Sequence, residues 1–243
     1  MLECVINISE GRNHAIIDSL AQSCAGGLLD IHSDPDHNRS VFTLVGVEAP
    51  RALARAAVAA ICLSDHSGVH PRIGVVDVVP FVPLVESTMH DAQKARDEFA
   101  AWAAEELHVP SFLYGTERTL PDIRKNAWAS LFPEVGLNVP HPTAGAMCVG
   151  MREPLVAYNL WLEDVDLEKT RRIASAVRTA SIRTLGLQVG TFTQVSVNLI
   201  QPILLRLLQG TRHLALLRTP LLRTEVVGLN QQQVSGWRLV HGH

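Results

Sequence analysis

The 243-residue chain has few aromatic side chains and no long uninterrupted apolar run. Its longest apolar stretches, 52–63 and 73–85, are broken by Arg55 and by Asp77 with two prolines, so neither predicts a membrane span. The first seven residues do not combine a basic segment with an apolar one, so no signal peptide is predicted. We therefore expect a cytoplasmic protein with no membrane partner.

The sequence also lacks several motifs that would define a function class. It has four cysteines, all far apart and without a CxxC pair, which we interpret as reduced core thiols. It has no P-loop, no GxSxG and no GxGxxG. Phosphate binding of the nucleotide type and serine-hydrolase chemistry therefore have no support.

Acidic residues are scarce in the last third of the chain. Residues 1–168 carry 11 Lys/Arg and 23 Asp/Glu, whereas residues 169–243 carry 10 and 1. This basic part has no lysine cluster and only one Trp and one Phe for base stacking, so we expect no nucleic-acid partner. Its arginines either bind an anionic small ligand in a groove or face solvent on outer helices, and the sequence leaves both open.

The order of predicted elements is βαββαβ, given twice. The first copy has strands at 2–8, 28–32, 40–47 and 73–82 with helices at 13–25 and 50–63, followed by a helix at 87–107, a strand at 109–114 and irregular chain to 142. The second copy has strands at 155–162, 187–189, 193–200 and 225–229 with helices at 166–179 and 203–218. We predict the α+β class, with two ferredoxin-like subdomains at 1–152 and 153–243. Facing antiparallel sheets with helices outside would cover both cores.

The loop before the strand at 73–82 is the best candidate for a catalytic site. Pro71 favours extended geometry at His70, and Arg72 lies beside this fixed imidazole, so the pair suits acid/base chemistry on an anionic substrate. Asp77 lies inside a valine run, where a buried carboxylate must be paired. A purely structural loop remains the alternative. A metal site on His66, His70 and Asp77 is disfavoured, because Gly68 and Pro71 argue against the helix that would bring the two histidines together.

Three other segments are candidate binding sites. Asn7 to Arg12 ends a predicted strand and starts a predicted helix, and the start of a helix favours anion binding. A simple capping turn would have the same sequence pattern. Asn38 and Arg39 either bind substrate or only close a hairpin. Small residues at 135–146 allow close approach of a flat ligand, but a plain linker would look similar.

Four motifs together resemble the glutamate formimidoyltransferase family, the transferase portion of formimidoyltransferase-cyclodeaminase. They are Glu3-Cys4-Val5-x-Asn7-x-Ser9-Glu10-Gly11-Arg12, Asn38-Arg39-Ser40-Val41-Phe42-Thr43, His66-x-Gly68-x-His70-Pro71-Arg72-Ile73-Gly74-x-x-Asp77-Val78-x-Pro80-Phe81 and Gln194-Val195-Ser196-x-Asn198-Leu199. The resemblance implies transfer of a formimino group from N-formimino-L-glutamate to N5 of tetrahydrofolate. It also implies two ferredoxin-like subdomains with facing sheets, a homodimer, no metal and only the transferase step in this chain.

The resemblance assigns roles to individual residues. His70 corresponds to the catalytic histidine. The expected substrate and support residues are Asn7, Arg12, Asn38, Arg39, Arg72 and Asp77. The expected folate-binding segment is Gly136, Leu137, Asn138, Val139, Pro140, His141, Pro142, Thr143, Ala144 and Gly145. Ser67 and Val69 replace the Lys and Glu usual in the histidine motif, so a catalytically impaired folate-binding homologue is the alternative function.

Overall fold

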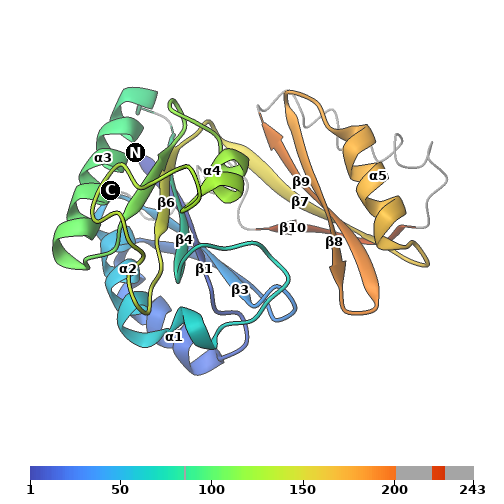
Figure 1. Cartoon of the computed structure of the whole chain (residues 1–243), viewed down its shortest axis with the longest axis horizontal. Helices are drawn as coiled ribbons and strands as arrows, with labels where there is room; N and C mark the ends of the chain where they lie inside the picture. The colour runs from blue at the N-terminus through green and yellow to red at the C-terminus, as the bar shows by residue number, and fades with distance from the viewer. Residues whose placement is uncertain (85, 201–220, 228–243) are drawn as a thin grey trace. The chain divides into compact units, whose positions relative to one another are not determined.

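The computed structural model describes residues 1–84, 86–200 and 221–227 (Figure 1). The chain divides into two compact units, Met1–Arg152 and Glu153–His243. Each unit is a mixed α/β structure built on its own sheet. Among the described helices, none is both long and apolar enough to cross a membrane.

The first unit contains a six-stranded sheet in the order β2-β3-β1-β4-β6-β5. Its strands are β1 (Leu2–Ile8), β2 (Leu28–Asp34), β3 (Arg39–Val45), β4 (Val76–Pro83), β5 (Ser111–Tyr114) and β6 (Met147–Met151). The β2–β3 hairpin and the pairing of β1 with β3 and β4 are antiparallel. β6 lies parallel to both β4 and β5, so the prediction of a wholly antiparallel sheet is wrong for this unit. Parallel neighbours need long connections, and the 32 residues between β5 and β6, which include α4, provide one.

Helices cover both faces of this sheet. α1 (His14–Ser23), α2 (Glu48–Ala60) and α3 (Met89–Glu106) lie on one side, and α4 (Leu120–Asn126) lies on the other (Figure 1). The larger core, which includes Ile6, Phe42 and Phe99, is under the three long helices. The smaller core joins Ile123 of α4 to Phe112 of β5 and to neighbouring strand residues.

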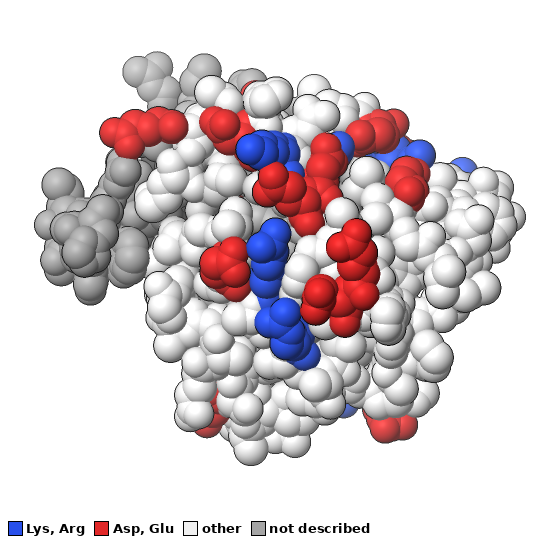
Figure 2. All heavy atoms as spheres, turned by 90° about the vertical axis from the view of Figure 1, so that its left-hand side faces the viewer, with Lys and Arg blue, Asp and Glu red and all other residues white. Residues whose placement is uncertain are grey.

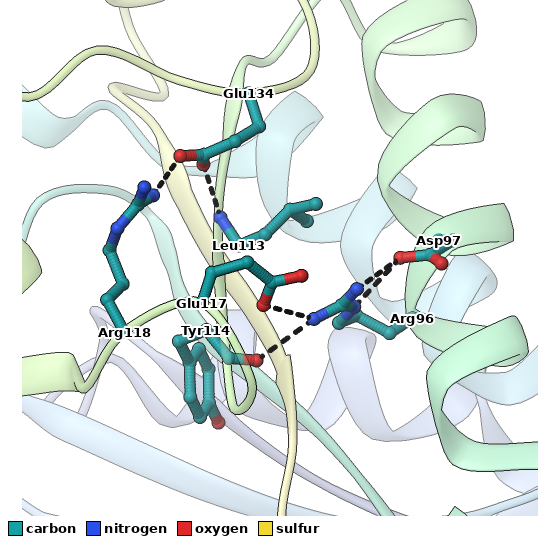
Figure 3. A network of polar contacts seen from close by, with 7 residues as sticks. All are labelled: Arg96, Asp97, Leu113, Tyr114, Glu117, Arg118 and Glu134. Atoms are coloured by element: carbon teal, nitrogen blue, oxygen red, sulfur yellow. Dashed lines mark hydrogen bonds and ion pairs between the residues drawn. The ribbon is translucent and has the colours of Figure 1, made fainter. Parts of the chain in front are cut away.

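A polar network holds the segment that leads into α4 (Figure 3). Arg96 of α3 is buried and forms ion pairs with Asp97 and Glu117, and it also donates to the carbonyl oxygen of Tyr114. The neighbouring Arg118 pairs with Glu134. These contacts fix the chain on both sides of the turn after β5, and so they fix where α4 begins.

The outer face over α2 and α3 carries both signs of charge (Figure 2). Arg51 pairs with Glu48 on α2, and Lys94 pairs with Glu98 on α3. The guanidinium groups of Arg51 and Arg55 also lie over the ring of Trp102, 5.8 and 5.3 Å from its centroid. The basic side chains here bind their own acidic and aromatic neighbours.

The second unit has a four-stranded antiparallel sheet in the order β10-β7-β9-β8. Its elements are β7 (Leu155–Leu162), α5 (Leu167–Val177), β8 (Ile182–Val189), β9 (Phe192–Ile200) and β10 (Leu221–Val227). α5 packs on one face through Ile173 and Ala174. Gly190, with φ of 58°, forms the β8–β9 turn where a break was predicted. The helix predicted at 203–218 lies outside the described residues.

The cations of the second unit that lie on α5 face solvent. Arg171 and Arg172 are exposed, and Arg172 pairs with Glu168 one turn earlier. For these two arginines the solvated-surface interpretation holds. Arg206, Arg212 and Arg218 of the predicted basic groove lie outside the described residues.

Candidate functional site

The His70 loop connects the 3-10 turn Leu63–Asp65 to β4, and both nitrogens of its imidazole have hydrogen-bond partners. Nδ1 lies 2.8 Å from the carbonyl oxygen of Pro71, which can only accept, so Nδ1 carries the hydrogen. Nε2 lies 2.9 Å from Nη1 of Arg39, which can only donate. His70 is therefore a neutral imidazole whose lone pair is on Nε2 and points toward Arg39.

The β2–β3 hairpin brings Arg39 to this position. Asn38 adopts the left-handed conformation with φ of 48°, which closes the hairpin just before β3. Its side-chain oxygen accepts from the backbone N–H of Gly11, 2.9 Å away, and its amide donates to the carbonyl of Ser67 at 3.0 Å. One asparagine thus ties the β1–α1 turn and the His70 loop to the hairpin.

His66 and Arg72 hold the His70 loop from within. Nε2 of His66 donates to the carbonyl oxygen of Asn38 at 2.6 Å. Arg72 donates through Nη2 to the carbonyl of His66 at 2.5 Å and through Nη1 to that of Gly68 at 3.5 Å. Gly68 has no room for a side chain, since an added Cβ would lie 2.2 Å from the carbonyl oxygen of His37. The loop therefore packs directly on the hairpin backbone.

Asp77 of β4 is 2% exposed, and both oxygens of its carboxylate accept hydrogen bonds. Its Oδ1 accepts from the backbone N–H of Ile73 at 2.8 Å and from Nη1 of Arg124 at 3.2 Å, and its Oδ2 accepts from Nη2 of Arg124. This bidentate pair joins the end of the His70 loop to α4. The sequence indicated that Asp77 needs a partner, but not that Arg124 provides it, because α4 lies in the segment predicted to be irregular.

His37 is a second site residue that the sequence analysis missed. It is 2% exposed, and its ring centroid lies 5.8 Å from that of His70 with the planes tilted by 50°. Its Nδ1 lies 3.7 Å from Oδ2 of Asp34, whose Oδ1 accepts from the His37 backbone N–H. Its place beside Asn38 and Arg39 in the hairpin motif was the signal that could have revealed it.

The electrostatics of the cluster keep His70 neutral. Burial lowers its pKa first, and the positive charges of Arg39 and Arg124 and the neighbouring His37 lower it further, to about 2. Burial also lowers the pKa of Arg39, against the attraction of Asp77 and Asp34. The pKa of His66 is lowered as well, again mainly by burial.

A small cavity lies at the centre of this cluster. Its lining residues are Ser9, His37, Asn38, Arg39, His66, His70, Arg72 and Asp77. The structure thus brings together five of the seven predicted catalytic and support residues. Asn7 is instead the last residue but one of β1, opposite Val41 and Val78, and Arg12 donates from Nε to the carbonyl of Pro35 at 2.7 Å.

The segment 136–145 does not line this cavity. Leu137 and Val139 are 66% and 59% exposed. The segment then turns at His141, whose Nδ1 accepts from the backbone N–H of Ala144 at 3.0 Å, and Gly145 pairs with Gly74 just before β4. The end of the segment is therefore attached to the base of the His70 loop.

The donor atoms of His70 and Asp77 in the alternative metal site are engaged elsewhere, and His66 keeps only its buried Nδ1 without a hydrogen-bond partner. Nε2 of His66 and both nitrogens of His70 have protein partners, and Asp77 is paired with Arg124. Within the part of the chain that the structure describes, no group of three or more His, Cys, Asp or Glu side chains could hold a metal ion.

Comparison with known proteins identifies the family. Residues 1–152 match the formiminotransferase domain, N-terminal subdomain. The chain is 36% identical over 231 residues to a glutamate formimidoyltransferase of Streptococcus pyogenes serotype M1, covering 82% of this chain and 77% of that protein. It is 33% identical over 235 residues to one from Thermoplasma acidophilum, covering 82% and 76%.

The chain is also similar to bifunctional proteins. It is 36% identical over 202 residues to the formimidoyltransferase-cyclodeaminase of Sus scrofa, covering 73% of this chain and 37% of that protein. These matches confirm the family predicted from the four motifs. The chain belongs to the formiminotransferase family.

Proposed function

We propose that this protein is a glutamate formimidoyltransferase, which transfers the formimino group of N-formimino-L-glutamate to N5 of tetrahydrofolate. The relatives that bear this name support the activity. The observation that carries the proposal is the lone pair of His70 Nε2, held in a cavity lined by Arg39 and Arg72. A basic nitrogen beside fixed cations suits proton transfer on a substrate with two carboxylates.

The reaction needs one proton to move twice. N5 of tetrahydrofolate attacks the formimino carbon and forms a carbon–nitrogen bond, and His70 Nε2 accepts the proton that N5 loses. The bond between that carbon and the glutamate nitrogen then breaks, and His70 returns the proton to the leaving nitrogen. The products are formimino-tetrahydrofolate and glutamate, and His70 is neutral again.

The other site residues act by holding His70 and binding substrate. Pro71 keeps the imidazole in the tautomer with its lone pair on Nε2. Asp77 and Asn38 position the loop, and Arg39 and Arg72 are the candidate partners of substrate carboxylates. Asn7 and Arg12 remain candidate support residues outside the cavity.

We infer that residues 136–145 bind the folate and that the second unit is the C-terminal subdomain of the transferase. The attachment of Gly145 to Gly74 and the exposed apolar side chains of Leu137 and Val139 support a binding role for this segment. A ferredoxin-like topology for both units is supported by the matching strand orders β2-β3-β1-β4 and β8-β9-β7-β10. The facing sheets, the homodimer and the cytoplasmic location stay predictions of the resemblance.

A transfer assay tests the proposed activity. Purified protein is mixed with N-formimino-L-glutamate and tetrahydrofolate, and the folate product is followed by absorbance together with release of glutamate. We expect both products in equal amounts. Folate binding without glutamate release, at saturating concentrations of both substrates, would instead identify a catalytically impaired folate-binding homologue.

A further inference from the structure

The nitrogen that His70 would use as a base is covered in this structure. Nη1 of Arg39 lies 2.9 Å from Nε2 and donates its hydrogen into the lone pair. The hydrogen on Nδ1 is held by Pro71, so the ring has no second basic site. As long as Arg39 stays in place, Nε2 cannot accept a proton from a substrate.

Arg39 itself lacks a counter-ion. Among the described residues it forms no ion pair, and its Nε is buried without a hydrogen-bond partner. The carboxylate of Asp77 accepts hydrogen bonds from Arg124 and Ile73. Asp34, the other nearby carboxylate, accepts through Oδ1 from two backbone N–H groups of its own turn. A buried guanidinium bonded to a neutral imidazole is a costly arrangement that an anion would relieve.

We propose that Arg39 is a displaceable cover on His70: a substrate carboxylate that enters the cavity binds the Arg39 guanidinium, draws it away from Nε2 and so exposes the base. This inference rests on the proposed function and adds the order of events at the same site. A carboxylate offers the guanidinium two charged oxygens and a bidentate geometry, whereas the neutral imidazole offers one lone pair, so the exchange favours the substrate. The backbone of Arg39 is fixed in β3, and only its side chain has to turn.

The move of Arg39 from His70 to a substrate carboxylate also changes the pKa of the His70 imidazole. The groups that face it are Arg39 and His37 from the hairpin, Arg124 from α4, Asp77 from β4 and Arg72 from its own loop. When the charge of Arg39 is neutralised by a carboxylate, the pKa of His70 rises from about 2 toward the range where a general base works at neutral pH. Until substrate binds, the imidazole stays neutral and blocked.

The test is an NMR titration of the histidine side chains, with L-glutamate as the probe. Protein carrying 15N-labelled histidine is titrated between about pH 5 and 8, the range of an unperturbed imidazole, without and with saturating glutamate. The His70 signals are assigned from a His70→Asn sample. We expect no protonation of His70 in the free protein and a measurable titration when glutamate is bound.

Two variants make the result specific. In Arg39→Gln, the Nε2 signal of His70 should shift without any ligand because the hydrogen bond from Arg39 is lost, and glutamate affinity should fall about 10- to 100-fold through loss of a charged hydrogen bond. Arg55→Gln removes the same charge from an exposed position on α2 and should behave like the unmodified protein.

The proposal is overturned if glutamate saturates the protein and leaves the His70 signals unchanged, or if about 10 mM glutamate does not bind at all. It is also overturned if the His70 signals of ligand-free Arg39→Gln match those of the ligand-free unmodified protein. The transfer assay on the same preparation separates the two hypotheses, because measurable transfer with an unresponsive His70 refutes only the displaceable cover.

Discussion

Replacement of Arg124 tests whether α4 holds the catalytic loop through the buried ion pair. The Asp77 side chain is 3% exposed and that of Arg124 is 18% exposed, so the two ends of the pair differ in their access to water. In Arg124→Leu, the carboxylate of Asp77 stays buried and loses both of its guanidinium hydrogen bonds. In Asp77→Asn, the more exposed guanidinium can turn toward solvent.

The expected cost therefore differs between the two variants. Removing one partner of a buried ion pair costs about 3–5 kcal/mol, and Arg124→Leu should lie in this range. Asp77→Asn keeps an oxygen for the N–H of Ile73 and frees a cation that water can reach, so we expect about 1–3 kcal/mol. The double variant should cost less than the sum, since neither charge is then left alone.

Urea unfolding of the four proteins gives these values, provided that the slopes with denaturant agree. Arg118→Leu, which removes an arginine whose partner carboxylate on Glu134 is 27% exposed, is the matched control and should cost less than Arg124→Leu. Equal losses for Arg124→Leu and Arg118→Leu, or a loss below about 1 kcal/mol for Arg124→Leu, would refute the role given to this pair.

Three further outcomes follow from particular contacts. Burial opposes ionisation of Glu117, but the hydrogen bond from Arg96 lowers the pKa of its carboxyl from 4.5 to about 2. The ionised carboxylate therefore contributes its full stabilisation above about pH 4.5 and loses it as the pH falls toward 2, so the free energy of unfolding of Glu117→Gln should depend less on pH over this interval. Gly68→Ala should lower kcat about 10- to 100-fold, because the new methyl group meets the His37 carbonyl and displaces the loop, whereas Gly26→Ala, which meets nothing within 4 Å, should leave kcat unchanged. Transfer activity should survive treatment with a chelator, and a loss that added metal restores would revive the metal-dependent alternative.

Much of the fold could be predicted where side-chain periodicity is strong. The strands β1, β3, β7 and β9 and the helix α1 start and end within two residues of the predicted limits. α4 was missed because its only buried apolar residue is Ile123, so it has no helical repeat, and its signal was the capping box of Thr119 and Asp122. β6 was missed because it contains Gly150, which is required where the ring of Tyr114 packs against its backbone.

The candidate site could be predicted where its residues lie in continuous motifs. The cavity around His70 is lined by Asn38, Arg39 and Arg72, which come from two of the four motifs that pointed to the family. Arg124 could not be paired with a carboxylate 47 residues away, because that contact depends on where α4 lies across the sheet. The bond between Arg39 and His70 was also beyond sequence reasoning, since it depends on the directions of two side chains, one at the start of β3 and one in the loop before β4.

The most direct test of the proposed mechanism is a comparison of His70→Ala with the unmodified protein in the transfer assay. The account predicts that kcat falls by about 10² to 10⁴, while tetrahydrofolate binds with unchanged affinity, because only the proton carrier is lost. His90→Ala, on the exposed start of α3, should keep full activity. Equal kcat for His70→Ala and the unmodified protein would contradict the account and remove His70 from the reaction.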